Sequence, residues 1–184
     1  MTHRMRRNLS LVPIVLAFAS GSGLPSSALA QGSKKAAPEF LMERMAGKWV
    51  MRGTMAGGKV THDVHVDRIL DRRYVRIHEL SREKDAWGKP AYEAWIHIAW
   101  DKEKEEFVVM WLDNTATTNF SPDGVGHGKP DGDRIPFVWN LADGSGIHNT
   151  FAYNRASDTW SWRIDNVDKS GKTSPFGRVT LKRK

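Results

Sequence analysis

Histidines and carboxylates are the residues of this chain best suited to chemistry, and their spacing decides which chemistry is open to them. Asp63, His65 and Asp67 alternate along one segment and so share a face, where they could bind a divalent ion. The same three side chains also suit a solvated outer face. His78 and His97 could meet across paired strands and hold a metal or a haem, or lie buried and hydrogen bonded. Because no HExxH motif is present, the sequence assigns neither a metal site nor a cofactor.

General acid–base chemistry depends on carboxylates that the fold buries. Glu79, Glu93 and Asp113 are the candidates, because a buried carboxylate can act as a general base. Asp113 ends an aromatic segment and is the best polar candidate for the mouth of a barrel, although it could simply start the turn at Asn114. No cysteine and no GxSxG, Walker or GxGxxG motif occurs. The sequence therefore names no catalytic residue and favours a binding protein over an enzyme.

A set of large side chains is expected to line a ligand cavity. Aromatic walls with a few polar groups are typical of sites for small molecules. The alternative is that the same side chains fill the core, where each buries much apolar area. The candidate ligand-binding residues are Trp49, Met51, His62, Trp111, Trp139, Phe151, Tyr153, Trp160, Trp162 and Arg178.

The elements that must position these residues are short β-strands that follow one short helix over 38–46. Apolar runs alternate with turn residues such as Gly57-Gly58, and no connection is long enough for a parallel crossover. This pattern predicts an all-β, antiparallel up-and-down β-barrel of about ten strands. The expected strands are 48–55, 60–70, 73–82, 91–100, 106–113, 116–121, 124–129, 134–141, 147–154, 158–166 and 174–182.

Alternation along each strand predicts which side chains point inward. His62 shares the apolar face of its strand with Val64 and Val66, so we expect it inside the barrel. Residues 91–113 break the rule, because both of their strands are apolar on both faces. Something should cover that outer surface, either the N-terminal helix or a second copy of the protein. We favour a homodimer formed through residues 91–113.

Residues 1–30 have the pattern of a cleaved export signal. Arg4, Arg6 and Arg7 precede an apolar run too short to span a bilayer, and Ala28-Leu29-Ala30 matches a small-x-small cleavage site. We expect cleavage after Ala30, a flexible leader over 31–37, and a single barrel domain over 38–184 in the periplasm or outside the cell. The sequence leaves general and twin-arginine export open.

Composition narrows the partners. Without residues 1–30, which hold three arginines and no acidic residue, the net charge falls from +7 to +4. Basic residues are scattered apart from 182–184, which predicts no binding to nucleic acid. Asp63, His65 and Asp67 on one outer face argue against insertion in a membrane as a barrel.

Gly47-Lys48-Trp49 resembles the Gly-x-Trp signature on the first strand of calycins, the superfamily of lipocalins, fatty-acid-binding proteins and avidins. The resemblance implies that Trp49 closes one barrel end under an arginine from the last strand. Arg178 is the candidate for that arginine.

Three further segments are similar to a bacterial lipocalin-like family of unknown function. They are Leu70 to Glu79, Ile98 to Asp101, and Trp111 to Thr115, and the resemblance spans roughly residues 40–182. Ala99 and Arg72 stand where that family is expected to have glycine. The family implies a ten-stranded barrel and no established activity.

Together these patterns predict an exported lipocalin-like protein that binds a small apolar or amphipathic molecule in its cavity. Two alternatives stay open, namely a barrel enzyme of the isomerase or hydrolase type, and a barrel that binds haem or a metal. A buried acid–base pair inside the lumen would favour the enzyme.

Overall fold

The computed structural model describes residues 38–115 and 124–184, which belong to one compact unit, Ser33–Lys184. The helix α1 covers Pro38–Met45. It starts at a proline, carries Glu39 in its first turn and ends before Gly47, as the sequence predicts. No helix in this described part of the chain has the length and apolar character needed to cross a membrane.

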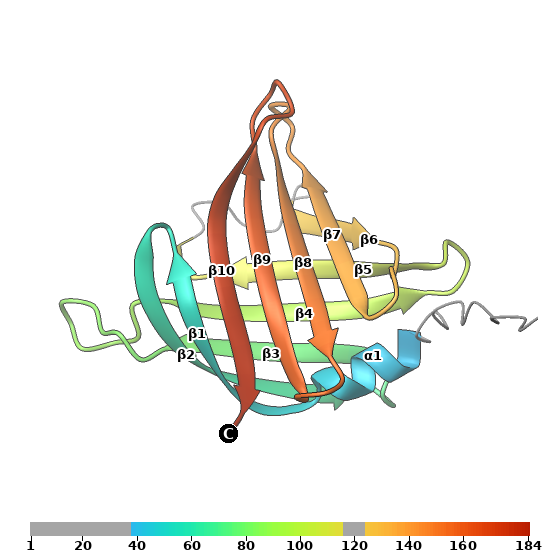
Figure 1. Cartoon of the computed structure of the whole chain (residues 1–184), viewed down its shortest axis with the longest axis horizontal. Helices are drawn as coiled ribbons and strands as arrows, with labels where there is room; N and C mark the ends of the chain where they lie inside the picture. The colour runs from blue at the N-terminus through green and yellow to red at the C-terminus, as the bar shows by residue number, and fades with distance from the viewer. Residues whose placement is uncertain (1–37, 116–123) are drawn as a thin grey trace, which may run out of the picture. The chain divides into compact units, whose positions relative to one another are not determined.

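Ten antiparallel strands close into a barrel in the order β1-β10-β9-β8-β7-β6-β5-β4-β3-β2, as Figure 1 shows. This confirms the predicted all-β, antiparallel up-and-down barrel. The strands are β1 Gly47–Met55, β2 Gly58–Ile69, β3 Tyr74–Ser81, β4 Glu93–Asp101, β5 Glu106–Asp113, β6 Val125–Gly128, β7 Arg134–Asn140, β8 Gly146–Asn154, β9 Thr159–Val167 and β10 Thr173–Arg183. The expected strand over 116–121 lies outside the described residues.

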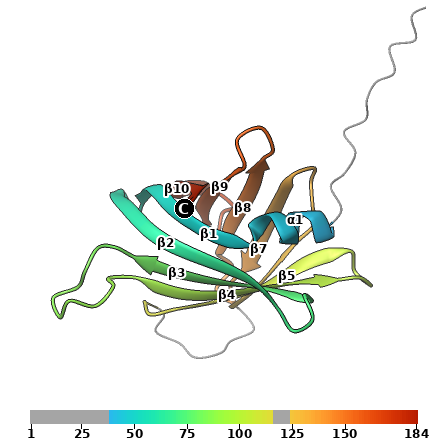
Figure 2. The same ribbon diagram turned by 90° about the horizontal axis from the view of Figure 1, so that it is seen from below.

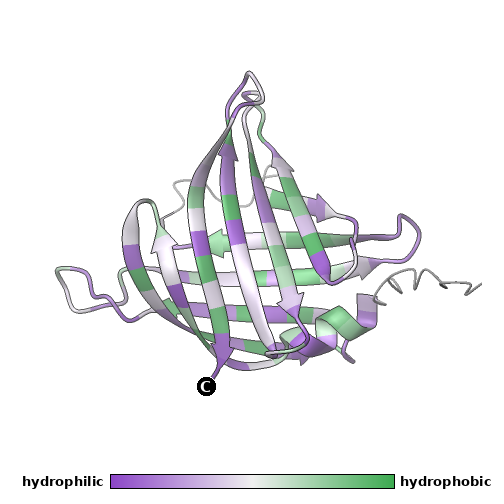
Figure 3. Cartoon of the chain, in the orientation of Figure 1, coloured by the Kyte–Doolittle hydropathy of each residue, from purple (hydrophilic) through white to green (hydrophobic). Residues whose placement is uncertain are grey.

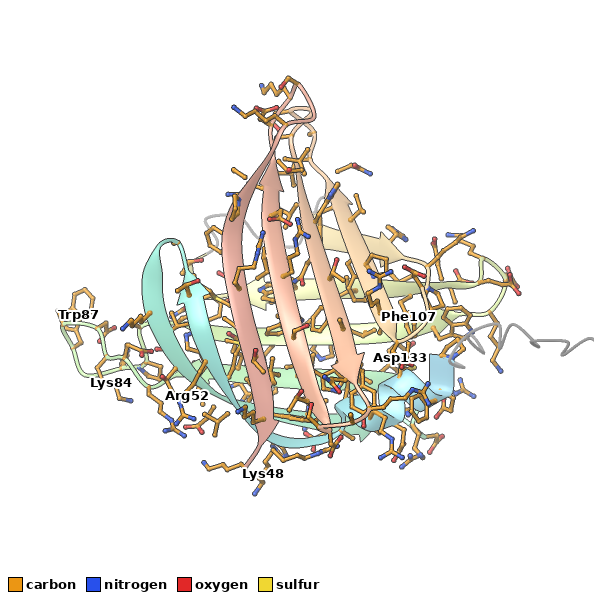
Figure 4. The ribbon with its side chains drawn as sticks, viewed as in Figure 1. Lys48, Arg52, Lys84, Trp87, Phe107 and Asp133 are labelled. Carbon is orange, nitrogen blue, oxygen red and sulfur yellow. The ribbon has the colours of Figure 1, made fainter. Side chains whose placement is uncertain are left out.

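Strand alternation sorts the side chains between the lumen and the outside, and it is visible as changing colours along the strands in Figure 3. On β2, His62, Val64 and Val66 are buried in the lumen, as predicted. The lumen holds most of the tryptophans. Trp87 is different, because it is 84% exposed at the tip of the β3–β4 connection (Figure 4).

The two ends of the barrel differ. At the proximal end, α1 leads into β1 (Figure 2), and the Trp49 indole donates a hydrogen bond of 2.8 Å to the carbonyl of Met45. The opposite, distal end carries the β1–β2, β3–β4, β7–β8 and β9–β10 connections. Several lumen residues are only partly buried there, among them Val60, Trp111 and Ile147. Access to the lumen is therefore easier from the distal end.

Residues 125–128 form the strand β6, within the strand predicted over 124–129. Gly126 has a specific reason to lack a side chain. A Cβ atom there would lie 2.5 Å from the Trp139 ring, so the indole packs directly on the backbone of β6.

Candidate functional site

A histidine and a glutamate form a buried pair inside the lumen. His62 on β2 and Glu79 on β3 both occupy inward positions, and the register, in which His62 pairs with Ser81 and Val64 with Glu79, makes them diagonal neighbours. His62 is 3% exposed and Glu79 is fully buried. His62 Nδ1 lies 2.5 Å from Glu79 Oε1. The structure therefore contains the acid–base pair that strand parity alone did not predict.

Burial dominates the electrostatics of Glu79. Loss of hydration raises the pKa of this carboxyl group, and the negative charge of Asp113 raises it further. The hydrogen bond and charge of His62 oppose that rise. The second carboxyl oxygen, Oε2, is buried and has no hydrogen-bond partner among the described residues. Such an atom is expected to bind a water molecule or a ligand.

Tyr92 links this pair to the barrel mouth. Its ring stacks on His62 with the centroids 5.6 Å apart, and its hydroxyl accepts a hydrogen bond of 3.0 Å from the Trp111 indole. The negative charge of Asp113 also acts on this hydroxyl. Burial, followed by the charges of Glu79 and Asp113, raises the pKa of Tyr92. Tyr92 therefore stays protonated.

Asp113 performs both of the roles that the sequence left open. As the last residue of β5, it faces the lumen side of the strand together with Trp111. Its Oδ1 atom also accepts hydrogen bonds from the Thr115 amide at 2.8 Å and the Thr115 hydroxyl at 2.6 Å. The turn contact holds the carboxylate in place beside Tyr92. We call His62, Glu79, Tyr92, Trp111 and Asp113 the distal cluster.

Aromatic rings adjoin the distal cluster. Trp111 contacts Trp139 and Trp162, with ring centroids 6.4 and 5.7 Å apart. The indole Nε1 of Trp162 and the Oδ1 of Asn149 are buried lumen atoms without a hydrogen-bond partner among the described residues. The lumen thus combines apolar ring surface with several unpaired polar atoms, which is the composition of a small-molecule site.

The proximal half of the lumen is filled. A cavity of about 10 Å³ remains there, and its lining includes Trp49, Phe151, Trp160 and Trp162. That space holds about one water molecule. Met51, which is fully buried, and Tyr153, whose hydroxyl donates to Asp158 at 2.8 Å, also pack in this core. These aromatic residues act mainly as core.

A larger hollow of about 410 Å³ lies at the distal end. Its lining residues belong to β8, β9 and β10 and to the connections next to them, and they include Leu141, Ile147, Asn166, Asp168 and Lys172. None of the predicted ligand-binding residues lines it. Strand patterns did not indicate this hollow, because four of its nine lining residues lie in connections whose position depends on barrel closure.

Arg178 does not cover Trp49, so the role that the calycin resemblance implied for it is corrected. Its guanidinium group donates to the carbonyl of Ile164 and pairs with Asp165. The arginine over Trp49 is Arg183, whose guanidinium carbon lies 3.9 Å from the ring centroid. Along β10, Arg183 follows the alternation of the inward residues Val179 and Leu181, whereas Arg178 occupies an outward position. Parity along β10 could have identified Arg183.

Of the two histidines proposed as metal or haem ligands, His78 has another partner. His78 lies 2.8 Å from Glu93 and stacks on Trp95 at 3.9 Å. His97 is on β4, and its buried Nδ1 has no hydrogen-bond partner among the described residues. Within residues 38–115 and 124–184, no group of three His, Cys, Asp or Glu side chains is placed to hold a metal ion.

The Asp63, His65 and Asp67 face is occupied by ion pairs. Asp63 accepts two hydrogen bonds from Arg82, at 2.9 and 2.8 Å, and Asp67 accepts one of 2.8 Å from Arg76. His65 lies 3.3 Å from Asp67. The solvated outer face is therefore the better description of these three residues.

Tyr92 is the functional candidate that sequence reasoning missed. It lies just before β4, and the expected strand over 91–100 already places it on the inward face with Ile96, but strand alternation did not reveal that it meets His62. Glu79 is a candidate general base from the sequence if the fold buries it. Its alternation with Val75 and Ile77 along β3 indicates an inward position. Comparison with protein-family models and with curated proteins found no match to this chain.

Proposed function

We propose that this barrel binds a small amphipathic molecule in the distal half of its lumen. The polar end of the ligand lies against the distal cluster, and its apolar part contacts the rings of Trp111, Trp139 and Trp162. The main observation behind this proposal is that Glu79 Oε2 is buried in an aromatic lumen and has no hydrogen-bond partner among the described residues. A buried polar atom without a partner is costly unless a bound molecule satisfies it.

The resemblance to calycins supports this proposal, because those barrels bind small molecules in their interior. Export to the periplasm or to the medium, with cleavage after Ala30, remains part of the same proposal. An exported binding barrel would collect its ligand outside the cytoplasm. The homodimer through residues 91–113 is a separate prediction.

A second candidate function is acid–base catalysis in the same lumen, and the buried His62–Glu79 pair favours it. A carboxyl group with a raised pKa is suited to accept a proton and return it near neutral pH. His62 holds Oε1 in place, so Oε2 is the atom free to face a substrate. An isomerase needs little more than such a base beside its substrate.

A broad ligand screen of the purified protein tests the binding proposal. For each compound, the melting temperature and the tryptophan emission of the protein are measured. We expect apolar and amphipathic ligands to raise the melting temperature and shift the emission. Trp111→Phe should reduce the emission change, because the ring lies beside the site. Trp87→Phe is the matched control, since Trp87 is exposed at a loop tip and should leave the change intact.

Native mass spectrometry separates the two candidate functions. If the wild type and Glu79→Gln retain the same co-purifying compound, the barrel binds without turnover. If Glu79→Gln retains a different compound, the lost base was needed to convert it. A screen that leaves both melting temperature and emission unchanged contradicts binding in the lumen.

A further inference from the structure

We propose that the ligand of the distal cluster is a cation, namely an amine or quaternary ammonium group carried on an apolar body. This inference rests on the proposed binding function and deepens it by naming the chemical class of the ligand. It follows from which charges face the lumen, which atoms lack partners, and which rings surround them.

Basic and acidic side chains at inward positions lie at different ends of the barrel. Arg68 and Arg183 lie at the proximal end, where Arg68 pairs with Glu39 of α1 at 2.9 Å and Arg183 donates to the carbonyl of Ala46 at 2.6 Å. Glu79 and Asp113 lie in the distal half. Among the described residues, no lysine or arginine occupies an inward strand position beside these two carboxyl groups. The lumen around Glu79 and Asp113 therefore attracts positive charge and repels anions.

The two carboxyl groups act on each other and on Tyr92. The charge of Asp113 raises the pKa of Glu79, and both charges raise the pKa of Tyr92. A cation placed between these groups would reverse that repulsion. Glu79 Oε2 has no partner within 38–115 and 124–184, and it can accept a hydrogen bond or a charge contact from an ammonium group.

The neighbouring rings suit the same ligand. The faces of indole rings attract cations more strongly than those of other aromatic side chains. Trp111 contacts Tyr92, Trp139 and Trp162, so three indole rings lie in or beside the distal cluster. Clusters of aromatic rings with a carboxylate are the usual way in which proteins bind quaternary ammonium groups. An anionic or neutral ligand could contact the rings, but it would bring no positive charge to either carboxyl group.

Proton binding should compete with the cation. The titratable groups around Glu79 are His62 on β2, Tyr92 before β4, and Asp113 on β5. Burial raises the pKa of Glu79, so lowering the pH protonates this carboxyl group first, and the loss of its negative charge weakens the attraction for a cation. We therefore expect affinity for a quaternary ammonium probe to fall as the pH falls.

Three matched probes test the inference on the full barrel: benzyltrimethylammonium, its neutral isostere neopentylbenzene, and phenylmethanesulfonate as the anion. Binding is measured by tryptophan emission and by calorimetry. We expect the cation to bind about tenfold tighter than the neutral isostere, and the anion weakest. Asp113→Asn and Glu79→Gln should remove most of the advantage that the cation has over neopentylbenzene.

Glu93→Gln is the control variant, because Glu93 lies on the outer face of β4 beside His78 and should keep the tenfold preference. Asp113→Asn retains the acceptor oxygen for Thr115, so the test does not depend on the folding of Glu79→Gln alone. Equal or tighter binding of the neutral or anionic probe overturns the cation inference but leaves the binding function standing. If none of the three binds although the broad screen finds a ligand, the cation inference alone is overturned; if the screen also fails, the proposed function fails with it.

Discussion

Glu79 shows how a single residue acquires unusual properties from its surroundings. In the unfolded chain it is an ordinary carboxyl group, whereas in the barrel it is fully buried and touches His62. Burial favours the neutral form and raises its pKa, and the charge of Asp113 adds to that effect. The hydrogen bond from His62 acts in the opposite direction but does not cancel it. Such a residue makes stability depend on pH.

At this scale we predict that Glu79→Gln changes the slope of stability against pH. Below the ordinary pKa of 4.5, Glu79 is protonated in both the folded and the unfolded state, so it imposes no penalty. As the pH rises from 4.5 through the raised pKa of Glu79 in the folded protein, the unfolded state releases the Glu79 proton more readily than the folded state. The free energy of unfolding of the wild type therefore falls. Glu79→Gln should lack this loss.

Urea unfolding between pH 5 and pH 9 measures both slopes. Glu93→Gln is the control and should follow the wild type, because Glu93 is partly exposed on the outer face. A Glu79→Gln slope equal to that of the wild type would show that Glu79 ionises normally in the folded protein.

At the scale of elements, side chains from the barrel cap the C-terminal end of α1. A helix end leaves carbonyl groups without partners. Here the Trp49 indole donates to Met45, the Trp160 indole donates to Arg44 at 3.2 Å, and Arg183 donates to Ala46. The positive charge of Arg183 also suits the negative end of the helix. These contacts fasten α1 over the proximal end and keep that half of the lumen closed.

We predict that Arg183→Met destabilises the protein by about 1–3 kcal/mol, since it removes the hydrogen bonds to α1, the contact with the Trp49 ring and the ion pair with Asp158. Lys182→Met is the control, because the neighbouring side chain points outward and is exposed. Thermal and urea unfolding measure both. Equal stability of the two variants would mean that Arg183 does not hold α1.

At the scale of the whole barrel, the outer face of β4 and β5 carries a group of apolar side chains. Trp95 is 37% exposed, and Val108, Met110 and Leu112 are partly buried on the same side. His78 already stacks on Trp95 and covers part of this surface. The homodimer predicted from residues 91–113 would bury the remainder.

For this prediction, sedimentation velocity should give a dimer for the wild type and a monomer for Met110→Glu, because a carboxylate in the centre of an apolar interface would be buried without a partner. Thr54→Glu, on the exposed outer face of β1, should remain dimeric. A wild type that sediments as a monomer at tens of micromolar contradicts the dimer.

The sequence by itself determined the barrel. Strand alternation and turn residues are local properties, so they placed strands such as β5 at 106–113 without error and put His62 inside the lumen. Local pattern also identified Glu79 as a base if it were buried. Parity along β10 held enough information to choose Arg183 over Arg178, but the resemblance to calycins pointed to the wrong arginine.

Only the tertiary structure decided which of these residues meet. The contact between His62 and Glu79 depends on the register of β2 against β3, and the stacking of Tyr92 on His62 depends on how the segment before β4 packs against β2. The filling of the proximal half likewise depends on the summed volumes of side chains from every strand. Alternation along one strand gives the face of each side chain, whereas register also depends on the geometry of the turn between strands. Closure depends on all ten strands together.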